Sequence, residues 1–185
     1  MTARAQTRSL RREEGFTLVE LLIAMMVLSI GVLALVAAYS SGFVALKRAT
    51  RVSSATLVAD SQMERLTALK YGNVALNISC GSSCSEDATY TGDSAYNGAA
   101  QVTTTGCTDA SCLPTQTTTG PDGKSYRLDT YVEYTCVSGT LSTSPSVTCG
   151  AGNPQPVKRV TVVVRSSSLT TPVREQSTFT QLSGS

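Results

Sequence analysis

The first third of the chain carries two hydrophobic patterns in succession. From Phe16 to Tyr39 nearly every position is apolar and Glu20 is the only charge, and about 20 such residues suffice for a helix to cross a bilayer. After Tyr39 apolar positions recur every three or four residues, which is typical of one face of an amphipathic helix. These positions are Phe43, Leu46, Ala49, Val52, Ala55, Ala59, Met63, Leu66 and Leu69. The pattern predicts one helix from about Phe16 to Tyr71, roughly 80 Å long at 1.5 Å per residue, with a glycine stop at Gly72.

The polar half of the chain predicts a small sheet near its end. Residues 72–125 are dominated by Ser, Thr, Gly, Asn and Ala and contain turn signals such as 121–123, so they predict a loop-rich connection with short strands at most. Apolar and polar residues alternate in 126–136 and 158–165, and more weakly in 173–182, which is typical of strands with one apolar face. We therefore predict an α+β fold in which the amphipathic helix covers a small antiparallel sheet.

Charge changes this picture mainly at the N-terminus. Four arginines against Glu13 and Glu14 give the first fifteen residues the whole net charge of the chain, +2. By the positive-inside rule the N-terminus lies in the cytoplasm and the rest crosses the membrane. Lys47, Arg48 and Arg51 form the only other close basic group, and three charges favour a solvated helix face over a nucleic-acid-binding surface.

Residue types needed for common catalytic sites are missing. The chain has no His, which is the commonest general base and metal ligand. It also has no Gly-rich phosphate loop, no G-x-S-x-G and no paired acidic motif. The sequence therefore predicts a protein that is not an enzyme and that uses neither a metal nor a cofactor.

All cysteines lie in the polar half of the chain. They are Cys80, Cys84, Cys107, Cys112, Cys136 and Cys149. An even number confined to this half predicts disulfides formed outside the cytosol, although sequence alone does not choose the connectivity. The simplest pairing joins the three consecutive pairs. A zinc knuckle is the alternative for the two short spacings, but the absence of His and an exported context favour disulfides.

Two ordinary explanations of the N-terminus leave Glu20 unexplained. A Sec signal peptide would have a basic start, an apolar stretch and a small-residue cleavage site before Tyr39. Its apolar stretch should carry no charge, however, and the helical pattern runs across that cleavage site. A plain one-span anchor accounts for the helix, but a carboxylate at the centre of a membrane helix costs about 2.5–3.5 kcal/mol on insertion scales. Glu20 therefore needs a partner.

Residues 15–24, GFTLVELLIA, resemble the class III signal of type IV prepilins and of the pseudopilins of type II secretion. In that family a prepilin peptidase in the membrane cleaves after the glycine and methylates the new N-terminal residue. The resemblance implies cleavage between Gly15 and Phe16, N-methylation of Phe16 and a role in subunit assembly for Glu20. In that role Glu20 of one subunit would neutralise the Phe16 amine of its neighbour.

Other features of the sequence are similar to those of PilV-type minor pilins and of the I-type minor pseudopilins. They are the leader length, the apolar run ALVAAYSSGF, the stretch ADSQMERL and the Val-rich KRVTVVVR. The chain departs from many major pilins, because Ala37 stands where they have a helix-breaking proline and because it lacks their single closing disulfide near the C-terminus. Ala37 implies an unbroken helix and argues against a stretch-tolerant major subunit.

The patterns and the resemblance together divide the chain into five predicted segments. These are a prepilin leader at 1–15, a transmembrane and filament-core helix at 16–42, an amphipathic helix half at 43–71, the loop-rich connection at 72–125 and the sheet region at 126–185.

The resulting hypothesis is a minor pilin, a structural subunit of a type IV pilus or pilus-like filament that contributes to assembly or to the tip. It would be a single-pass inner-membrane protein with a cytoplasmic N-terminus, and would then join other pilin subunits in an extracellular or periplasmic filament. The alternatives are a minor pseudopilin of type II secretion and a Sec-secreted, disulfide-stabilised binding domain. As a binding module, residues 72–125 would contact a surface, another pilin, or DNA if the pilus takes up DNA.

Overall fold

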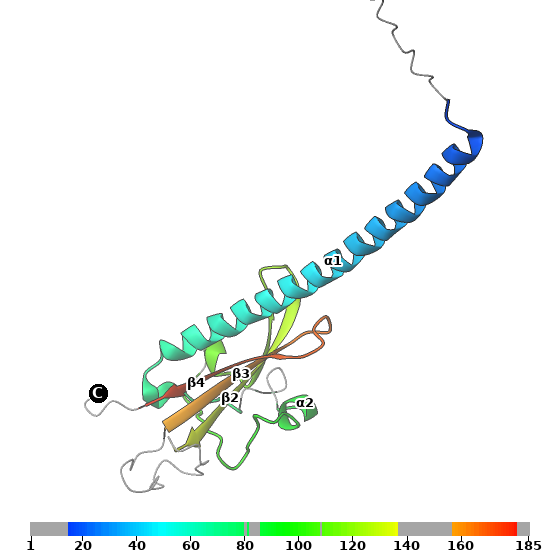
Figure 1. Cartoon of the computed structure of the whole chain (residues 1–185). Coiled ribbons are helices and arrows are strands. Elements are labelled where there is room, and N and C mark those ends of the chain that lie inside the picture. Colours follow the sequence, from blue (N-terminus) through cyan, green and yellow to red (C-terminus); the bar gives the residue numbers. More distant parts are fainter. Residues whose placement is uncertain (1–14, 80, 82–85, 108, 137–156, 181–185) are drawn as a thin grey trace, which may run out of the picture. The chain divides into compact units, whose positions relative to one another are not determined.

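The computed structural model describes residues 15–79, 81, 86–107, 109–136 and 157–180. The elements in chain order are α1 (Leu18–Thr67), η1 (Tyr71–Asn73), α2 (Ala88–Thr91), η2 (Ala110–Cys112), β1 (Thr115–Thr119), β2 (Ser125–Thr135), β3 (Val157–Arg165) and β4 (Val173–Phe179) (Figure 1). They form two compact units, Met1–Leu46 and Lys47–Ser185, called unit 1 and unit 2 below. The predicted α+β arrangement of one long helix and an antiparallel sheet is confirmed.

The helix α1 is continuous over 50 residues. No proline precedes Pro114 in the chain, so nothing removes a backbone donor from the helix interior. The helix ends at Thr67, before the predicted Tyr71, because the chain tightens: the Leu69 amide donates to the Leu66 carbonyl, three residues back, at 3.2 Å. Gly72 then lies inside the short turn η1 instead of ending the helix.

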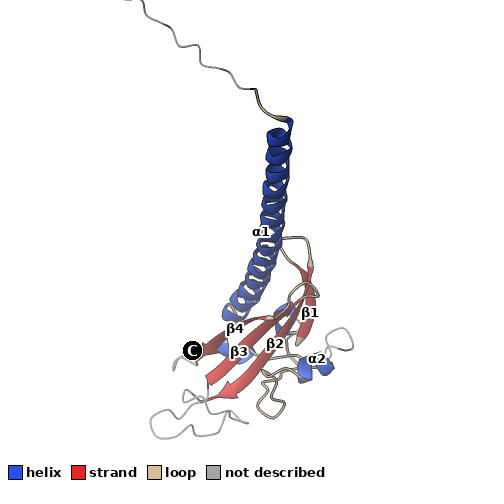
Figure 2. Cartoon of the chain, turned by 45° about the vertical axis from the view of Figure 1, so that its right-hand side comes forward, coloured by secondary structure: helices blue, strands red, loops and turns tan. Residues whose placement is uncertain are grey.

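The sheet of unit 2 has four antiparallel strands in the order β1-β2-β3-β4 (Figure 2). Strands β2, β3 and β4 are the three predicted from alternation. Strand β1 was not predicted as part of the sheet, because TQTTT has no apolar alternation. It is held by a hairpin with β2, in which the Gly120 amide donates to the Lys124 carbonyl at 2.8 Å. Gly123 has a φ of 71° in this turn, a conformation that favours glycine.

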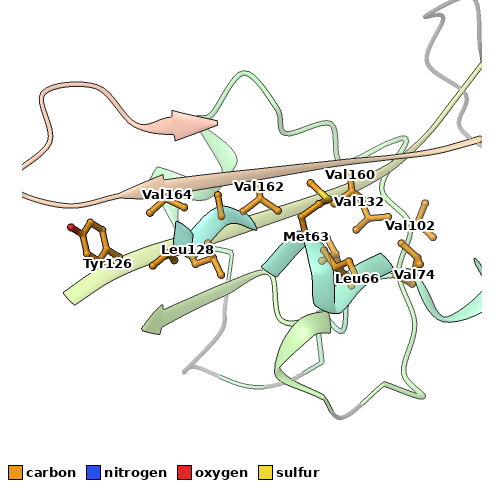
Figure 3. Close-up of a cluster of buried hydrophobic side chains, with 14 of the residues drawn as sticks. Met63, Leu66, Val74, Val102, Tyr126, Leu128, Val132, Val160, Val162 and Val164 are labelled. Carbon is orange, nitrogen blue, oxygen red and sulfur yellow. The ribbon is translucent and has the colours of Figure 1, made fainter. Parts of the chain in front are cut away.

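One face of the sheet packs against the C-terminal part of α1 (Figure 3). The labelled core side chains are Met63, Leu66, Val74, Val102, Tyr126, Leu128, Val132, Val160, Val162 and Val164. The predicted apolar stripe is buried here only from Ala55 onward. Phe43 and Leu46, earlier on the stripe, are 62% and 64% exposed. The stripe thus has a covered part in unit 2 and an uncovered part that needs another partner.

The opposite face of the sheet is covered as well, which the sequence did not predict. Tyr90 of α2 stacks on Tyr131 of β2 with ring centroids 4.3 Å apart, and both pack with Val163. The Tyr90 hydroxyl donates to the Thr130 carbonyl at 2.8 Å. The segment 86–96, expected as part of a loop-rich connection, is therefore a second covering layer.

A buried lysine fastens β3 to the chain that leaves α1. Lys158 is only 3% exposed, and its ammonium donates to the carbonyls of Tyr71 at 2.7 Å and Val74 at 2.8 Å. It also lies 4.6 Å from the centre of the Tyr71 ring, within the range of a cation–π contact. Burial lowers the pKa of Lys158 to about 8, because desolvation disfavours the charged form.

Replacing a core leucine of α1 should test the packing of helix on sheet. Leu66 is fully buried and Leu57, on the same helix, is 53% exposed. We expect Leu66→Ala to lower the free energy of unfolding of unit 2 by about 2–5 kcal/mol, because it leaves a cavity. The matched variant Leu57→Ala should stay within about 0.5 kcal/mol.

The measurement is urea unfolding of the full chain in a nonionic detergent, followed by tyrosine fluorescence, since Tyr90, Tyr126 and Tyr131 are buried in unit 2. Equal losses for the two leucine variants would contradict this packing.

Candidate functional site

Residues 16–46 present an almost continuous apolar surface. The large side chains from Phe16 to Leu46 that are exposed include Phe16 at 81% and Leu33 at 68%. Among the described residues, α1 is the one helix long and apolar enough to cross a membrane, and its most apolar window has no buried residue. Apolar surface of this extent needs cover from lipid or from other proteins.

The serine hydroxyls of this segment form hydrogen bonds to backbone carbonyls of the same helix. Ser29 donates to the Met25 carbonyl at 2.8 Å, Ser40 to the Ala37 carbonyl at 2.9 Å, and Ser41 to that of Ala38 at 2.9 Å. Such bonds satisfy polar groups where no water is available. The segment therefore suits an apolar surrounding better than its serine content alone indicates.

Glu20 lies in the first turn of α1, not at the centre of the apolar helix. Its backbone amide donates to the Thr17 hydroxyl at 3.3 Å, so Thr17 caps the helix, and T-x-x-E is the capping-box sequence. A carboxylate in the first turn is favoured by the helix dipole, typically by about 0.3–1 kcal/mol. The insertion cost assumed for a central carboxylate is therefore too high for Glu20. The T-x-x-E spacing of Thr17 and Glu20 is a signal of this cap in the sequence itself, although the start of the helix was not predicted from it.

The Gly15–Phe16 peptide bond lies outside the helix. Residues 15–17 are described as non-helical and exposed, and no atom lies within 4 Å of a side chain placed at Gly15. The structure thus puts Gly15, Phe16 and Glu20 in one short stretch around the start of α1. None of the ion pairs found among the described residues involves the Glu20 carboxylate.

Two of the predicted cysteine positions form a described disulfide. Cys107 and Cys112 are joined, with Cα atoms 6.2 Å apart, and Cys136 is disulfide-bonded as well. The other candidates, Cys80, Cys84 and Cys149, lie outside the described residues, so the pairings predicted for them remain predictions. The Cys107–Cys112 bond lies beside Asn77, whose side-chain amide donates to the Cys107 carbonyl at 2.7 Å, and so ties this loop to the chain after η1.

Ion pairs hold the segment 86–96 on its face of the sheet. Arg127 of β2 makes two hydrogen bonds to Asp87, at 2.6 and 2.7 Å. Arg174 of β4 does the same to Asp93, at 2.7 and 2.8 Å, and Arg165 of β3 also donates to Asp93. Bidentate arginine–carboxylate pairs fix geometry as well as charge. Strands β2, β3 and β4 therefore each contribute an arginine that pairs with Asp87 or Asp93 of this segment.

Two carboxylates of β2 complete the network. Asp129 is fully buried and accepts hydrogen bonds from Arg127 at 2.7 Å and Arg165 at 2.9 Å. Glu133 accepts from Arg159 at 2.9 and 3.0 Å. The alternation in β2 predicted the side on which these acids lie, but not their burial.

The acids of the network have depressed pKa values. Burial raises the pKa of Asp93, but hydrogen bonds from Arg174 and the Ala95 amide and the charges of Arg174 and Arg165 outweigh it, and the pKa falls to about 2. The hydrogen bonds from Arg127 hold the pKa of Asp87 well below its ordinary value. Both carboxylates are thus ionised at neutral pH and serve to hold the fold.

The described part of the chain contains a mixed polar and apolar groove but no cluster of metal ligands. No group of three His, Cys, Asp or Glu side chains there could hold a metal ion. A groove of about 390 Å³ between α1 and β1 is lined mainly by amides, hydroxyls and apolar groups, with Arg65 as its one titratable side chain. The lining includes the buried Gln62, which accepts a hydrogen bond from Gln116 at 3.1 Å.

The N-terminal geometry agrees with a match to a known motif. Residues 10–36 match the family model described as the prokaryotic N-terminal methylation motif. The match spans the non-helical Gly15–Phe16 bond, Glu20 and the start of the apolar helix, whereas residues 37–185 lie outside it. No curated protein and no solved structure shows significant similarity to the chain.

The chain therefore carries the class III signal of type IV pilin-like proteins, a structural group of proteins. The motif implies processing by a prepilin peptidase and assembly with other pilins. Together with the exposed apolar helix it fits a membrane-anchored protein.

The ion pairs of Asp93 with Arg165 and Arg174 should make the free energy of unfolding depend on pH. The folded pKa of about 2 lies below the ordinary value of 3.8, so the unfolded state binds more protons between these values and stability is lost as pH falls through them. At neutral pH, Asp93→Asn should cost about 1.5–3 kcal/mol of unfolding free energy, the range for hydrogen bonds to charged groups.

The difference between wild type and Asp93→Asn should shrink between pH 4 and pH 2 in urea unfolding of the full chain in nonionic detergent. Glu64→Gln, an exposed carboxylate of α1, is the matched control and should show no such trend. A difference that stays constant down to pH 2 would refute this role of Asp93.

Proposed function

We propose that this protein is a minor pilin: a non-enzymatic structural subunit of a type IV pilus or pilus-like filament that needs no cofactor. Prepilin peptidase would cleave it between Gly15 and Phe16 and methylate the new Phe16 amine. The observation that carries the proposal is the coincidence of the methylation motif at 10–36 with a non-helical Gly15–Phe16 bond directly before an exposed apolar helix.

The start of α1 supports cleavage at this bond. Peptidases act most readily on exposed, irregular backbone, and residues 15–17 are of that kind. Thr17 caps the helix and so keeps the scissile bond outside it. The arginines of the leader would hold residues 1–15 on the cytoplasmic side before cleavage.

Residues 16–46 would store the subunit in the inner membrane. The helical stretch from Leu18 to Leu46 is about 42 Å long at 1.5 Å per residue, close to the roughly 40–45 Å of a bilayer with its headgroup regions. During assembly the same surface would leave lipid and pack on the helices of neighbouring subunits. One apolar surface would then serve both states, because neither surrounding offers water.

Glu20 would act at the moment of assembly. Its carboxylate takes part in none of the described ion pairs, while cleavage creates an ammonium at Phe16. A neighbouring subunit's amine is the partner of opposite charge that the family resemblance implies, and attraction in a low-dielectric surrounding is strong only at close range. The attraction would therefore be strong only when an entering subunit has the correct axial position relative to its neighbour.

The structure of unit 2 favours a structural role over a free binding loop. Within the predicted connection 72–125, the segment 86–96 is held on the sheet by ion pairs of Asp87 and Asp93, and β1 extends the sheet. The continuous helix around Ala37 agrees with a minor subunit. A minor pseudopilin of type II secretion has the same processing and anchor, and differs in the filament that it joins.

Processing can be tested by intact mass and N-terminal sequencing of the protein extracted from membranes. We expect a mature chain that begins at methylated Phe16. In a Gly15→Leu variant, which changes the residue before the cut and leaves α1 intact, the leader should be retained. A chain that begins at Tyr39 would overturn the proposal in favour of a Sec-secreted domain.

The role of Glu20 can be tested by removing its charge alone. We expect Glu20→Gln to be processed and membrane-bound as in wild type, but to enter filaments poorly, because the Phe16 amine is left without a counter-charge. Ser29→Ala, which changes a polar group in the same helix without changing charge, is the control. The readout is the amount of each variant in sheared filaments relative to membranes, and wild-type incorporation of Glu20→Gln would show that the charge is dispensable.

A further inference from the structure

Four basic side chains gather at the end of unit 2 where α1 enters this unit. Lys47, Arg48 and Arg51 lie within the first turns of α1 in this unit, and Lys124 lies in the β1–β2 turn; together they are called the basic end patch. The turn is placed beside the helix by Tyr126, whose hydroxyl lies 3.5 Å from the Arg51 carbonyl. Lys47, Arg48 and Lys124 are exposed and Arg51 is half-buried.

The patch is not neutralised by ion pairs with carboxylates. None of the ion pairs among the described residues includes any of its four members, and Arg48 donates only to the neutral Thr170 hydroxyl, at 3.2 Å. Asp122, two residues before Lys124, accepts hydrogen bonds from the Tyr126 hydroxyl at 2.8 Å and from the Lys124 backbone amide at 3.1 Å. By contrast, the arginines of β2, β3 and β4 are all paired.

Charge in unit 2 is therefore polarised. The basic end patch has four cations and one neighbouring acid, whereas the rest of unit 2 has seven basic and nine acidic side chains. The net positive charge at this end attracts an anionic surface. The small net negative charge of the rest of the unit repels such a surface only weakly. The surface that fits this end should carry negative charge and lie where α1 enters the unit.

The order of residues along α1 identifies that surface. Lys47 directly follows Leu46, the end of the stretch whose length of about 42 Å matches a bilayer with its headgroups. Tyr39 and Phe43 come just before it, and aromatic side chains are enriched at the membrane–water interface. The cations then fall at the level of the lipid phosphates on the side opposite the leader, where the positive-inside rule disfavours basic residues.

We propose that the basic end patch binds anionic phospholipid headgroups on the outer side of the membrane while the subunit is stored there. The inference rests on the proposed function, since it needs residues 16–46 in a bilayer. Headgroup phosphates supply the counter-charges that unit 2 lacks at this end. Transfer into a filament removes these contacts, so anionic lipid would favour the stored state over the assembled one.

The test uses the full processed chain in vesicles with unit 2 outside, and an acylating reagent that labels lysine amines. Vesicles of phosphatidylethanolamine with phosphatidylglycerol are compared with vesicles of phosphatidylcholine. In the anionic vesicles at low salt, Lys47 and Lys124 should react about fivefold more slowly, the effect of one basic side chain at an anionic surface. About 0.5 M salt should abolish the difference. Lys70, exposed beyond the other end of α1, is the internal control and should react equally throughout.

Substitutions test whether the basic side chains of the patch contribute jointly to the protection of Lys47. Arg48→Gln with Arg51→Gln should bring the labelling of Lys47 in anionic vesicles close to its rate in phosphatidylcholine, whereas Arg65→Gln, on the same helix outside the patch, should leave it unchanged. Tyrosine fluorescence checks that unit 2 is folded in each variant.

Three results would overturn the inference. Equal labelling of Lys47 in both vesicle types would show that lipid charge is not read, and protection of Lys70 to the same degree would show a non-specific effect. Protection that appears only when a second protein is added would assign the patch to an acidic protein partner. A chain that fails to float with the vesicles at all would instead contradict the membrane storage in the proposed function.

Discussion

The fold of unit 2 depends on the packing of α1 on the valine-rich face of the sheet. Ala55 and Ala59 have small side chains that let the helix approach closely, and they share one buried cluster with Met63 and Leu66 of α1 and with Val160 and Val162 of β3. Burial of apolar area at about 25 cal/mol per Å² makes such a face the main favourable term. Lys158 then fixes the chain where it leaves the helix.

The second face of the sheet is stabilised differently. A small aromatic cluster, Tyr90 on Tyr131, is surrounded by arginine–carboxylate pairs that join α2 and its flanking segment to three strands. Because these carboxylates are buried or bidentate, each pair restricts geometry more than an exposed pair would. A polar sequence is thereby turned into a fixed layer, and the domain presents a defined surface instead of a flexible loop.

The N-terminal segment meets a different requirement, which is to be stable without water. Its serines bond to their own helix, and its one acid sits in the first turn, beside the Thr17 cap. Under the proposed function, these features would lower the cost of lipid burial and would leave the Glu20 carboxylate available for the amine that cleavage would create. The basic end patch extends the same reasoning to the opposite end of the apolar stretch, where the proposed headgroup contacts would form.

The sequence by itself determined the features that depend on local pattern. The apolar run with Glu20, the motif around Gly15 and Phe16, the long helix without proline and the alternating strands β2 and β3 were all readable, because periodicity and short motifs need no knowledge of distant residues. Only the tertiary structure decided that TQTTT is a strand, that the apolar stripe is covered from Ala55 onward, and that Asp93 meets Arg174. Those outcomes depend on pairings between residues far apart in the chain, and a polar segment carries no local signal of the partner that will order it.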